Sequence, residues 1–453
     1  MKTRNVAFVL TLVVAMLISA CQPLVIPPTQ APTQEPTQAP TEEIIDPTPV
    51  EGVVTGEIGV IKSDKSLITD QTVTADDLKL LAEAENAFML NLYKQLAAGE
   101  GNIIFSPYSL YQALLMAYVG ADGETARQMA EVLQLTQEDD FNHLVMNNLN
   151  QLLTDPSASD LKNKFVFTSA NAVWGQYDFA FQQSYLDQLA EYYGTGLRAV
   201  DFAQSEEARA MINEWVSEQT QQKIKELIPQ GVLDAATRMV LTNAVYFKAG
   251  WMKQFEDYNT EKDSFYLLDG SVKEVDMMNI QDHFSYQVAD GYIAIELPYE
   301  GGKFSMVVYM PEAGKLHEFE QGLETSLLSD LTAKFGRGKV NLSFPKFKIE
   351  SSLDLGGALS ELGMVDAFDA SLADFSKMTG AKDLMITNVL QKAMVEVDEK
   401  GTEAAAATAV VVGVTSMPVE EEPQVIKIDH PFLFFIRDVE TNTTLFMGRV
   451  TNP

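Results

Sequence analysis

Histidine and cysteine perform most acid–base and nucleophilic chemistry at neutral pH, and both are scarce in this sequence. Its 453 residues contain four histidines and a single cysteine, Cys21. His317 and Glu318 begin like the helix motif of a zinc protease, but Gln321 stands where the second histidine is needed. Metal-ligand spacing is also missing around His143, His283 and His430. We therefore expect no metal site and no cofactor.

Two serine–lysine pairs have the spacing found in penicillin-binding enzymes. They are Ser159 with Lys162 and Ser343 with Lys346. The Lys-Thr-Gly motif that accompanies such pairs is absent, and so are the Gly-x-Ser-x-Gly elbow and the phosphate-binding loop. The sequence therefore favours a protein that is not an enzyme, with enzymatic activity kept as a rival interpretation.

The composition is that of a globular and strongly acidic protein. Hydrophobic residues make up 46% of the chain and charged residues 21%, which is apolar enough for a large core. Lys and Arg total 32 against 64 Asp and Glu, which gives a net charge of -32. Phosphate backbones would be repelled by this charge, so nucleic acid is excluded as a partner.

Helical patterns dominate the first half of the folded body, and strand patterns dominate the second. Apolar residues recur at helical spacing after Asp76 and Asp77, from Ser106 to Val119, and in 124–133, 182–193 and 206–227. We expect strands at 165–174, 238–249, 304–310, 340–349, 385–397, 425–436 and 444–450, and a hairpin at 265–275. Because the two kinds of element do not alternate, the sequence predicts an α+β fold.

The N-terminus has the pattern of an export signal. Lys2 and Arg4 precede an apolar run, 6–18, that is shorter than the ~20 residues of a membrane span. Small residues then lead to Cys21, and the stretch 18–21 resembles a bacterial lipobox. The resemblance implies a signal peptide at 1–20 and a lipid on Cys21. The alternative is a plain secretory signal with an incidental cysteine.

A proline-rich spacer follows the export signal. Eight of the 18 prolines lie between Pro23 and Pro49, where the backbone is expected to be extended and semi-rigid. The stretch 51–73 remains polar and rich in turn residues. We interpret 21–75 as a tether and 76–453 as the folded domain. The protein is then an exported cell-envelope lipoprotein that faces the extracytoplasmic or extracellular side and contacts the membrane only through its lipid.

One stretch near the C-terminus fits neither a stable core nor an ordinary loop. Residues 404–414 carry no charge, few large side chains and no amphipathic period. The run of valines weakens the case for a buried helix, and the apolar content weakens the case for a permanent surface loop. A strand that is exposed in one state and paired in another would explain both properties.

The stretch from Glu399 to Thr408 closely resembles the hinge of a serpin reactive-centre loop. Further serpin-like motifs follow in the family's order, at 102–110, 241–251, 344–347, 373–376, 429–436 and 446–449. The resemblance covers 76–453. It implies a serpin fold with three β-sheets, about nine helices and an exposed reactive-centre loop, in one domain rather than the two that the length suggests.

The resemblance implies inhibition by conformational trapping. A serine or cysteine endopeptidase attacks the loop and forms an acyl-enzyme, and the cut loop then inserts as a new strand in the central sheet. Alternation along that strand places the even-numbered residues 402–412 on one face and 403–409 on the other. The hinge consists of Glu399, Gly401, Thr402, Glu403, Ala404, Ala405, Ala406, Ala407 and Thr408.

Counting along the family's loop from Gly401 predicts that the bond between Thr415 and Ser416 is cut, with Val414 and Met417 as the nearest alternatives. No Lys or Arg lies between Gly401 and Ile426. A trypsin-like protease, whose specificity pocket binds a positively charged side chain, is therefore disfavoured. The favoured partner is an elastase-like or subtilisin-like endopeptidase. We expect the chain itself to be a monomer.

The resemblance also assigns roles to residues around the central sheet, which must open to admit the loop. By resemblance, Ser106, Ser109, Asn243 and Gln391 form the polar shutter beneath the opening point, with Gln391 where the family usually has histidine. Trp251 and Lys346 match the breach, where Lys346 is predicted to pair with Glu399. The main alternative is a non-inhibitory serpin that acts as a binding or structural protein, although the small side chains of the hinge favour inhibition.

Overall fold

The computed structural model describes residues 53–55, 58–70, 72–135, 139–154, 165–328, 334–402 and 422–453. Residues from Val50 to Pro453 form one compact unit. The predicted lipid site Cys21, most of the predicted tether and the loop residues 403–421 lie outside the described residues. No helix within the described ranges is long and apolar enough to cross a membrane.

Ten α-helices lie within the described residues, where about nine were expected. The first begins with a capping box, because the hydroxyl of Thr74 accepts from the Asp77 N–H while Asp77 accepts from Thr74. The helices are α1 (Ala75–Leu96), α2 (Pro107–Tyr118), α3 (Gly123–Val132), α4 (Asp139–Thr154), α5 (Gln183–Tyr193), α6 (Ser205–Gln219), α7 (Leu316–Gln321), α8 (Thr325–Leu328), α9 (Gly356–Glu361) and α10 (Ser376–Thr379).

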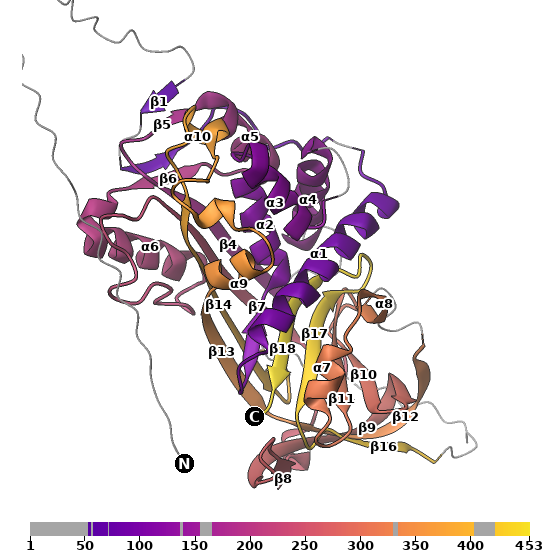
Figure 1. The fold of residues 1–453 in the computed structure, drawn as a ribbon. Coiled ribbons are helices and arrows are strands. Elements are labelled where there is room, and N and C mark those ends of the chain that lie inside the picture. The colour runs from indigo at the N-terminus through magenta and orange to yellow at the C-terminus, as the bar shows by residue number, and fades with distance from the viewer. Residues whose placement is uncertain are drawn as a thin grey trace, which may run out of the picture. The chain divides into compact units, whose positions relative to one another are not determined.

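A seven-stranded mixed sheet forms the centre of the molecule (Figure 1). Its long strands β4 and β7 are antiparallel, whereas β7 and β14 are parallel. The order across the sheet is β13 (Phe347–Asp354), β14 (Ile386–Asp398), β15 (Gly401–Thr402), β7 (Met239–Gly250), β4 (Phe165–Gln176), β6 (Leu197–Val200) and β2 (Gly59–Ile61).

A nine-stranded sheet carries the C-terminal part of the chain. Its path is β16 (Gln424–Lys427), β12 (Gly336–Pro345), β9 (Val272–Ala289), β10 (Tyr292–Pro298), β11 (Phe304–Pro311), β17 (Phe432–Asp438), β18 (Thr444–Val450) and β3 (Ile103–Phe105), and β8 (Glu261–Tyr266) pairs with β9. A third, two-stranded sheet pairs β1 (Val53–Thr55) with β5 (Ala180–Gln182).

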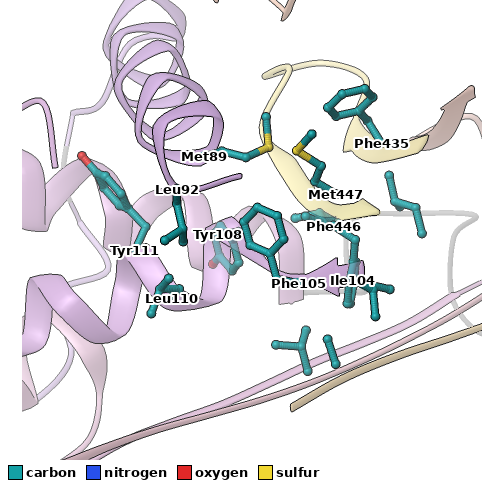
Figure 2. Packing of buried hydrophobic residues seen from close by; sticks show 14 of the residues in the cluster. Met89, Leu92, Ile104, Phe105, Tyr108, Leu110, Tyr111, Phe435, Phe446 and Met447 are labelled. Atoms are coloured by element: carbon teal, nitrogen blue, oxygen red, sulfur yellow. The ribbon is translucent and has the colours of Figure 1, made fainter. Parts of the chain in front are cut away.

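Both faces of the central sheet are covered. The main core packs α1 and α2 against the strands, and Figure 2 shows Met89, Tyr108 and Phe446 meeting there from α1, α2 and β18. A smaller core lies on the other side, where α6 covers Trp174, Val240 and Leu390 of three central strands. Any new strand in this sheet must therefore fit between two packed layers.

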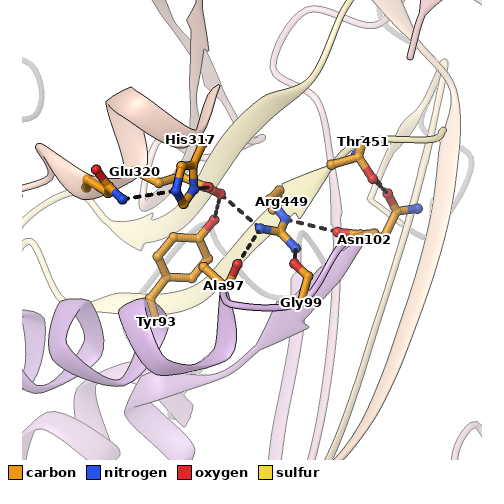
Figure 3. Close-up of polar contacts among 10 residues, drawn as sticks. Tyr93, Ala97, Gly99, Asn102, His317, Glu320, Arg449 and Thr451 are labelled. Atoms are coloured by element: carbon orange, nitrogen blue, oxygen red, sulfur yellow. Dashed lines mark hydrogen bonds and ion pairs between the residues drawn. The ribbon is translucent and has the colours of Figure 1, made fainter. Parts of the chain in front are cut away.

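A buried arginine fixes the turn that leads into β3 and α2 (Figure 3). Arg449 is 3% exposed and donates to the carbonyls of Ala97, Gly99 and Gly101. Its charge is balanced by Glu320, at 3.2 Å, which also accepts from the Tyr93 hydroxyl. This cluster joins β18 to the end of α1 and thereby positions Ser106, the residue that caps α2.

The structure confirms the α+β fold and places breaks inside two predicted strands. The stretch 340–349 is divided between β12 and β13 at Lys346, and 425–436 is divided between β16 and β17 around Pro431. The stretch 206–227, predicted to hold one or two helices, contains α6, which ends at Gln219. Periodicity detects apolar runs but not the single residue at which a chain leaves one sheet for another.

Candidate functional site

The ladder between β14 and β7 opens at one end of the central sheet. The two strands pair in parallel from Ile386 and Met239 to Ala393 and Val245. Beyond that point the short strand β15 lies between them, and its Thr402 pairs with both Val397 and Ala249. The sheet is therefore already split by the first two residues of an additional antiparallel strand.

Glycine is required at the first residue of this short strand. Gly401 has a φ of +156°, and a Cβ placed on it would lie 2.2 Å from the carbonyl oxygen of Ala249. The turn before it is held by Asp398, whose carboxylate accepts from the backbone N–H groups of Lys400 and Gly401. The chain leaving β14 is thus folded back tightly between the two long strands.

Thr402 anchors the strand in the main core. Its side chain is fully buried, and its hydroxyl lies 2.6 Å from the hydroxyl of Tyr299. The Tyr299 ring stacks on Trp251 with a centroid separation of 4.6 Å, and the Trp251 indole donates to the carbonyl of Asp398. The predicted breach tryptophan therefore contacts the turn directly and is linked to Thr402 through Tyr299.

Lys346 and Glu399 form the ion pair that the sequence predicted. The ammonium Nζ lies 2.8 Å from Oε2 of Glu399, and the Thr260 hydroxyl donates to Oε1. Burial raises the pKa of Glu399, but the hydrogen bonds from Lys346, the backbone and Thr260 outweigh it and leave the pKa below its ordinary value. Lys346 sits at the break between β12 and β13, so the pair joins both large sheets to the hinge.

Glu399→Gln is expected to lower stability by about 1 kcal/mol at neutral pH, because the pair is partly exposed. The pKa of Glu399 is lower in the folded chain than its ordinary value of 4.5. The ion pair's contribution to stability is therefore present above pH 4.5 and is lost as pH falls through the lower pKa of the folded chain. Urea unfolding should therefore show a difference in the free energy of unfolding between the two proteins that narrows as pH falls below 4.5. A gap independent of pH would contradict the pair's role, and Glu396→Gln, in a more exposed pair with Lys348, is the matched control.

The four predicted shutter residues lie together beneath the closed part of the ladder. Gln391 of β14 accepts from the Ser106 N–H and donates to the Ser106 carbonyl, both at 2.9 Å. Its amide also donates to Asn243, its register partner on β7. Asn243 in turn donates to the hydroxyl of Ser109. Gln391 thus links the two strands that must separate to the cap of α2, at the position where the resembled family usually has histidine.

Three further polar residues complete this network. Asn171 of β4 is the register partner of Asn243 and accepts from both Asn243 and Ser109. It donates to Gln112 of α2 at 2.7 Å and to Ser169 at 3.1 Å. No sequence motif pointed to Asn171, Ser169 or Gln112, although polar residues within an apolar strand and an apolar helix were a usable signal.

Gln391→Leu is expected to destabilise the chain by about 2–4 kcal/mol, because the buried Ser106 N–H and the Asn243 side-chain oxygen lose their hydrogen bonds to Gln391. Equilibrium unfolding in urea measures the loss. Gln391→His retains a donor and an acceptor and should lose less than half as much. Equal stability of the leucine variant and the native chain would show that the network does not hold the strands together.

The remaining predicted site residues, Glu403 to Thr408, Val414, Thr415, Ser416 and Met417, lie outside the described residues. The two ends of their segment are fixed. It leaves Thr402 inside the central sheet and returns before β16, which pairs in parallel with β12. Within the described ranges, no group of three or more His, Cys, Asp or Glu residues could hold a metal ion.

Comparison with known proteins agrees with this architecture. Residues 83–453 match the family model described as Serpin (serine protease inhibitor). An uncharacterised serpin-like protein of Thermococcus kodakarensis is 40% identical over 376 residues, which cover 83% of this chain and 86% of that protein. Leukocyte elastase inhibitor A of Mus musculus is 37% identical over 392 residues, which cover 83% of this chain and all of that protein.

A solved structure shows the same likeness in three dimensions. The crystal structure of the thermophilic serpin tengpin in its native state superposes with a TM-score of 0.76 at 28% identity, covering 87% of this chain and 98% of tengpin. The chain belongs to the serpin family.

Proposed function

We propose that this chain inhibits a serine, or alternatively a cysteine, endopeptidase as a suicide substrate. The observation that carries the proposal is the opened ladder, in which Gly401 and Thr402 already pair with both β7 and β14. Cleavage of the loop would free the following residues to continue this strand. The acyl-enzyme would then be carried along the sheet while still attached to the loop. Serpins are typically inhibitors rather than enzymes, and the residues of this site serve movement rather than catalysis.

Extension of the existing register assigns a place to each incoming residue. Thr408 would lie between Asn243 and Gln391 and replace the hydrogen bond that joins them in the closed sheet. Ala407 would lie between Ala244 and Lys392, under the smaller core. Even-numbered residues would face the main core because Thr402 does. The hinge alanines would therefore insert where the packed layers on both faces of the central sheet leave little space for larger side chains.

The energy available from insertion is large. The parallel ladder between β14 and β7 is exchanged for two antiparallel ladders, which are slightly more stable per residue. About a dozen net hydrogen bonds at ~1 kcal/mol each supply on the order of 10 kcal/mol. Ordinary domains are stable by only about 5–15 kcal/mol, so this energy can distort the active site of a bound protease. Misplacement by ~1 Å already slows a reaction by about 100-fold.

We assign the cut to Thr415–Ser416, with Val414 and Met417 as neighbouring choices. Small apolar and hydroxyl side chains suit the pockets of elastase-like and subtilisin-like enzymes, and a relative with 37% identity is named an inhibitor of leukocyte elastase. The absence of Lys and Arg from 402–426 disfavours a trypsin-like target.

A panel of purified serine and cysteine proteases tests this assignment. Elastase-like and subtilisin-like enzymes should be inactivated at least about ten times faster than trypsin, and the released peptide should be the 38 residues from Ser416 to Pro453. Fastest inactivation of trypsin, or a peptide that starts more than two residues from Ser416, would refute the assignment.

Export and lipid anchoring through Cys21 belong to the same proposal. The apolar run 6–18 and the lone cysteine support it, and the proline-rich stretch up to Pro49 would hold the domain away from the membrane surface. Incorporation of a radiolabelled fatty acid into the native chain but not into Cys21→Ser would support the anchor, and equal labelling would exclude it.

A further inference from the structure

Three cations gather where β12 begins. Lys334 and Arg337 are exposed, and Lys339 is partly buried. Within the described part of the chain none of the three takes part in an ion pair, although Asp and Glu outnumber Lys and Arg by 64 to 32. Asp282, on the neighbouring strand β9, pairs with Lys253 at 3.2 Å instead. A strongly acidic chain therefore presents a local positive surface here, which we call the basic corner.

Packing holds the basic corner in place. Phe335 packs against the main core, and β12 pairs with β9 along its whole length. Gly338 lies against the ring of Tyr286, because a Cβ placed on it would be 3.3 Å from that ring. Arg337 and Lys339 are two residues apart on a strand, so their side chains share one face of the sheet. A partner would therefore meet charges on a backbone that is already ordered.

The basic corner lies beside the point where the loop re-enters the sheet. Strand β16 runs parallel to β12, and its Gln424 pairs with Val340, the residue after Lys339 (Figure 1). The predicted bond at Ser416 lies eight residues before Gln424, so it is at most about 29 Å away. An endopeptidase of about 250 residues is roughly 45 Å across. Its surface would therefore reach the basic corner when its active site holds the loop.

The loop's own acidic residues are the competing occupant. Residues 420–422 are all glutamate and come just before β16. Glu422 is exposed and forms no ion pair with any described residue. A continued parallel register would place Glu422 beside Gly338, with its side chain on the face opposite to Arg337 and Lys339. The described contacts thus leave the three cations for a partner.

We propose that the basic corner docks an acidic surface beside the active-site cleft of the target endopeptidase. The inference rests on the proposed function, because it takes the loop to be attacked by a protease. It narrows the target to elastase-like or subtilisin-like enzymes with a negatively charged rim. Opposite charges at the rim of an interface chiefly raise the association rate. A long polyanion fits less well, because the net charge of -32 repels it and three cations neutralise only a short stretch.

Subtilisin and its succinylated form test this surface. Succinylation converts the enzyme's surface lysines to carboxylates and spares its Ser-His-Asp triad, which a small substrate can verify. The initial rate of loop cleavage is measured as covalent complex plus cleaved chain. At low salt the succinylated enzyme should cut a chain with Lys334→Gln, Arg337→Gln and Lys339→Gln at least about fivefold more slowly than the native chain. The difference should fall below about twofold in ~0.5 M salt, and also with unmodified subtilisin.

The matched control combines Lys62→Gln, Lys94→Gln and Lys225→Gln. These three lysines are exposed, have no ion pair among the described residues and lie outside β12, and their loss removes the same charge. Succinylated subtilisin should cut this control within about twofold of the native rate. Equal slowing of the two triple variants would show that only the net charge matters and would overturn the proposal.

Two other results would identify a different occupant. In a chain with Glu420→Gln, Glu421→Gln and Glu422→Gln, neutralising the basic corner should still slow cleavage by succinylated subtilisin. If that effect vanished, the basic corner would bind the loop's own glutamates, and the proposal would be overturned. Retention of the native chain but not the neutralised variant on dextran sulfate, with equal cleavage rates, would identify a polyanion and overturn it as well.

The products separate this inference from the proposed function. Charge-dependent cleavage that ends in cleaved chain and active enzyme would refute trapping and retain the docking surface. Covalent complex that forms equally fast on the native chain and on the neutralised variant would refute the docking surface alone. A loop that neither form of the enzyme cuts would refute both.

Discussion

Thr402→Arg is expected to convert the inhibitor into a substrate. Thr402 is fully buried against Tyr299 on the main-core side of the sheet, so an arginine there cannot keep both its charge solvated and the strand in place. A cost of about 3 kcal/mol in the insertion step corresponds to roughly a 100-fold shift from trapping to release. Titration of an elastase-like protease with the variant should give cleaved chain and free enzyme.

Thr402→Ser is the matched control for this experiment. It keeps the hydroxyl that bonds Tyr299 and fits the same space, so its yield of covalent complex should stay within about twofold of the native chain. The initial cleavage rate should be similar in all three proteins, because the protease attacks residues remote from Thr402. Full trapping by the arginine variant would show that the loop inserts without Thr402 seated in the sheet.

Loop cleavage is expected to raise the melting temperature by about 10 °C or more. On the order of 10 kcal/mol is gained by insertion, and a domain of nearly 400 residues has an unfolding entropy of about 0.8 kcal/mol per degree. A zinc metalloprotease should make the cut, since it attacks with metal-bound water and forms no acyl-enzyme that would be trapped. Calorimetry before and after cleavage, with fragment masses to locate the cut, measures the change.

The cleaved Thr402→Arg variant provides the comparison. Its loop is cut in the same way, but the arginine displaces the residue from which the inserted strand would continue, so its melting temperature should rise by less than a third as much. The same melting experiment separates inhibition from the main alternative, a serpin with a binding or structural role. A native chain whose stability is unchanged by cleavage would belong to the non-inhibitory class.

Much of the candidate site could be predicted from the sequence because its parts follow fixed motifs. Close backbone contact with Ala249 requires glycine at position 401, so the hinge can be recognised as a sequence pattern. Trp251 and Lys346 lie in short motifs of their own, and the structure brings both to the turn around Glu399. Such contacts join residues far apart in the chain, so the family resemblance was needed to connect them.

Other features depend on the assembled sheet and escaped prediction. Asn171 becomes part of the shutter only because β4 pairs with β7 in a register that places it beside Asn243. The polar, turn-rich stretch around Ile61 and Ile68 has no periodicity, and its place is set by an open sheet edge and by the side chains of α4. Edge pairing uses backbone groups, which every sequence has, and therefore leaves little trace in composition.

Inhibition by trapping requires that the chain captures a protease covalently and keeps it. The most direct measurement mixes the native chain with an equal amount of an elastase-like serine protease and separates the products in SDS. Trapping should give a stable species with the mass of the protease plus the chain without its last 38 residues, together with loss of protease activity. Complete cleavage of the loop with the protease fully active and no such species would contradict it.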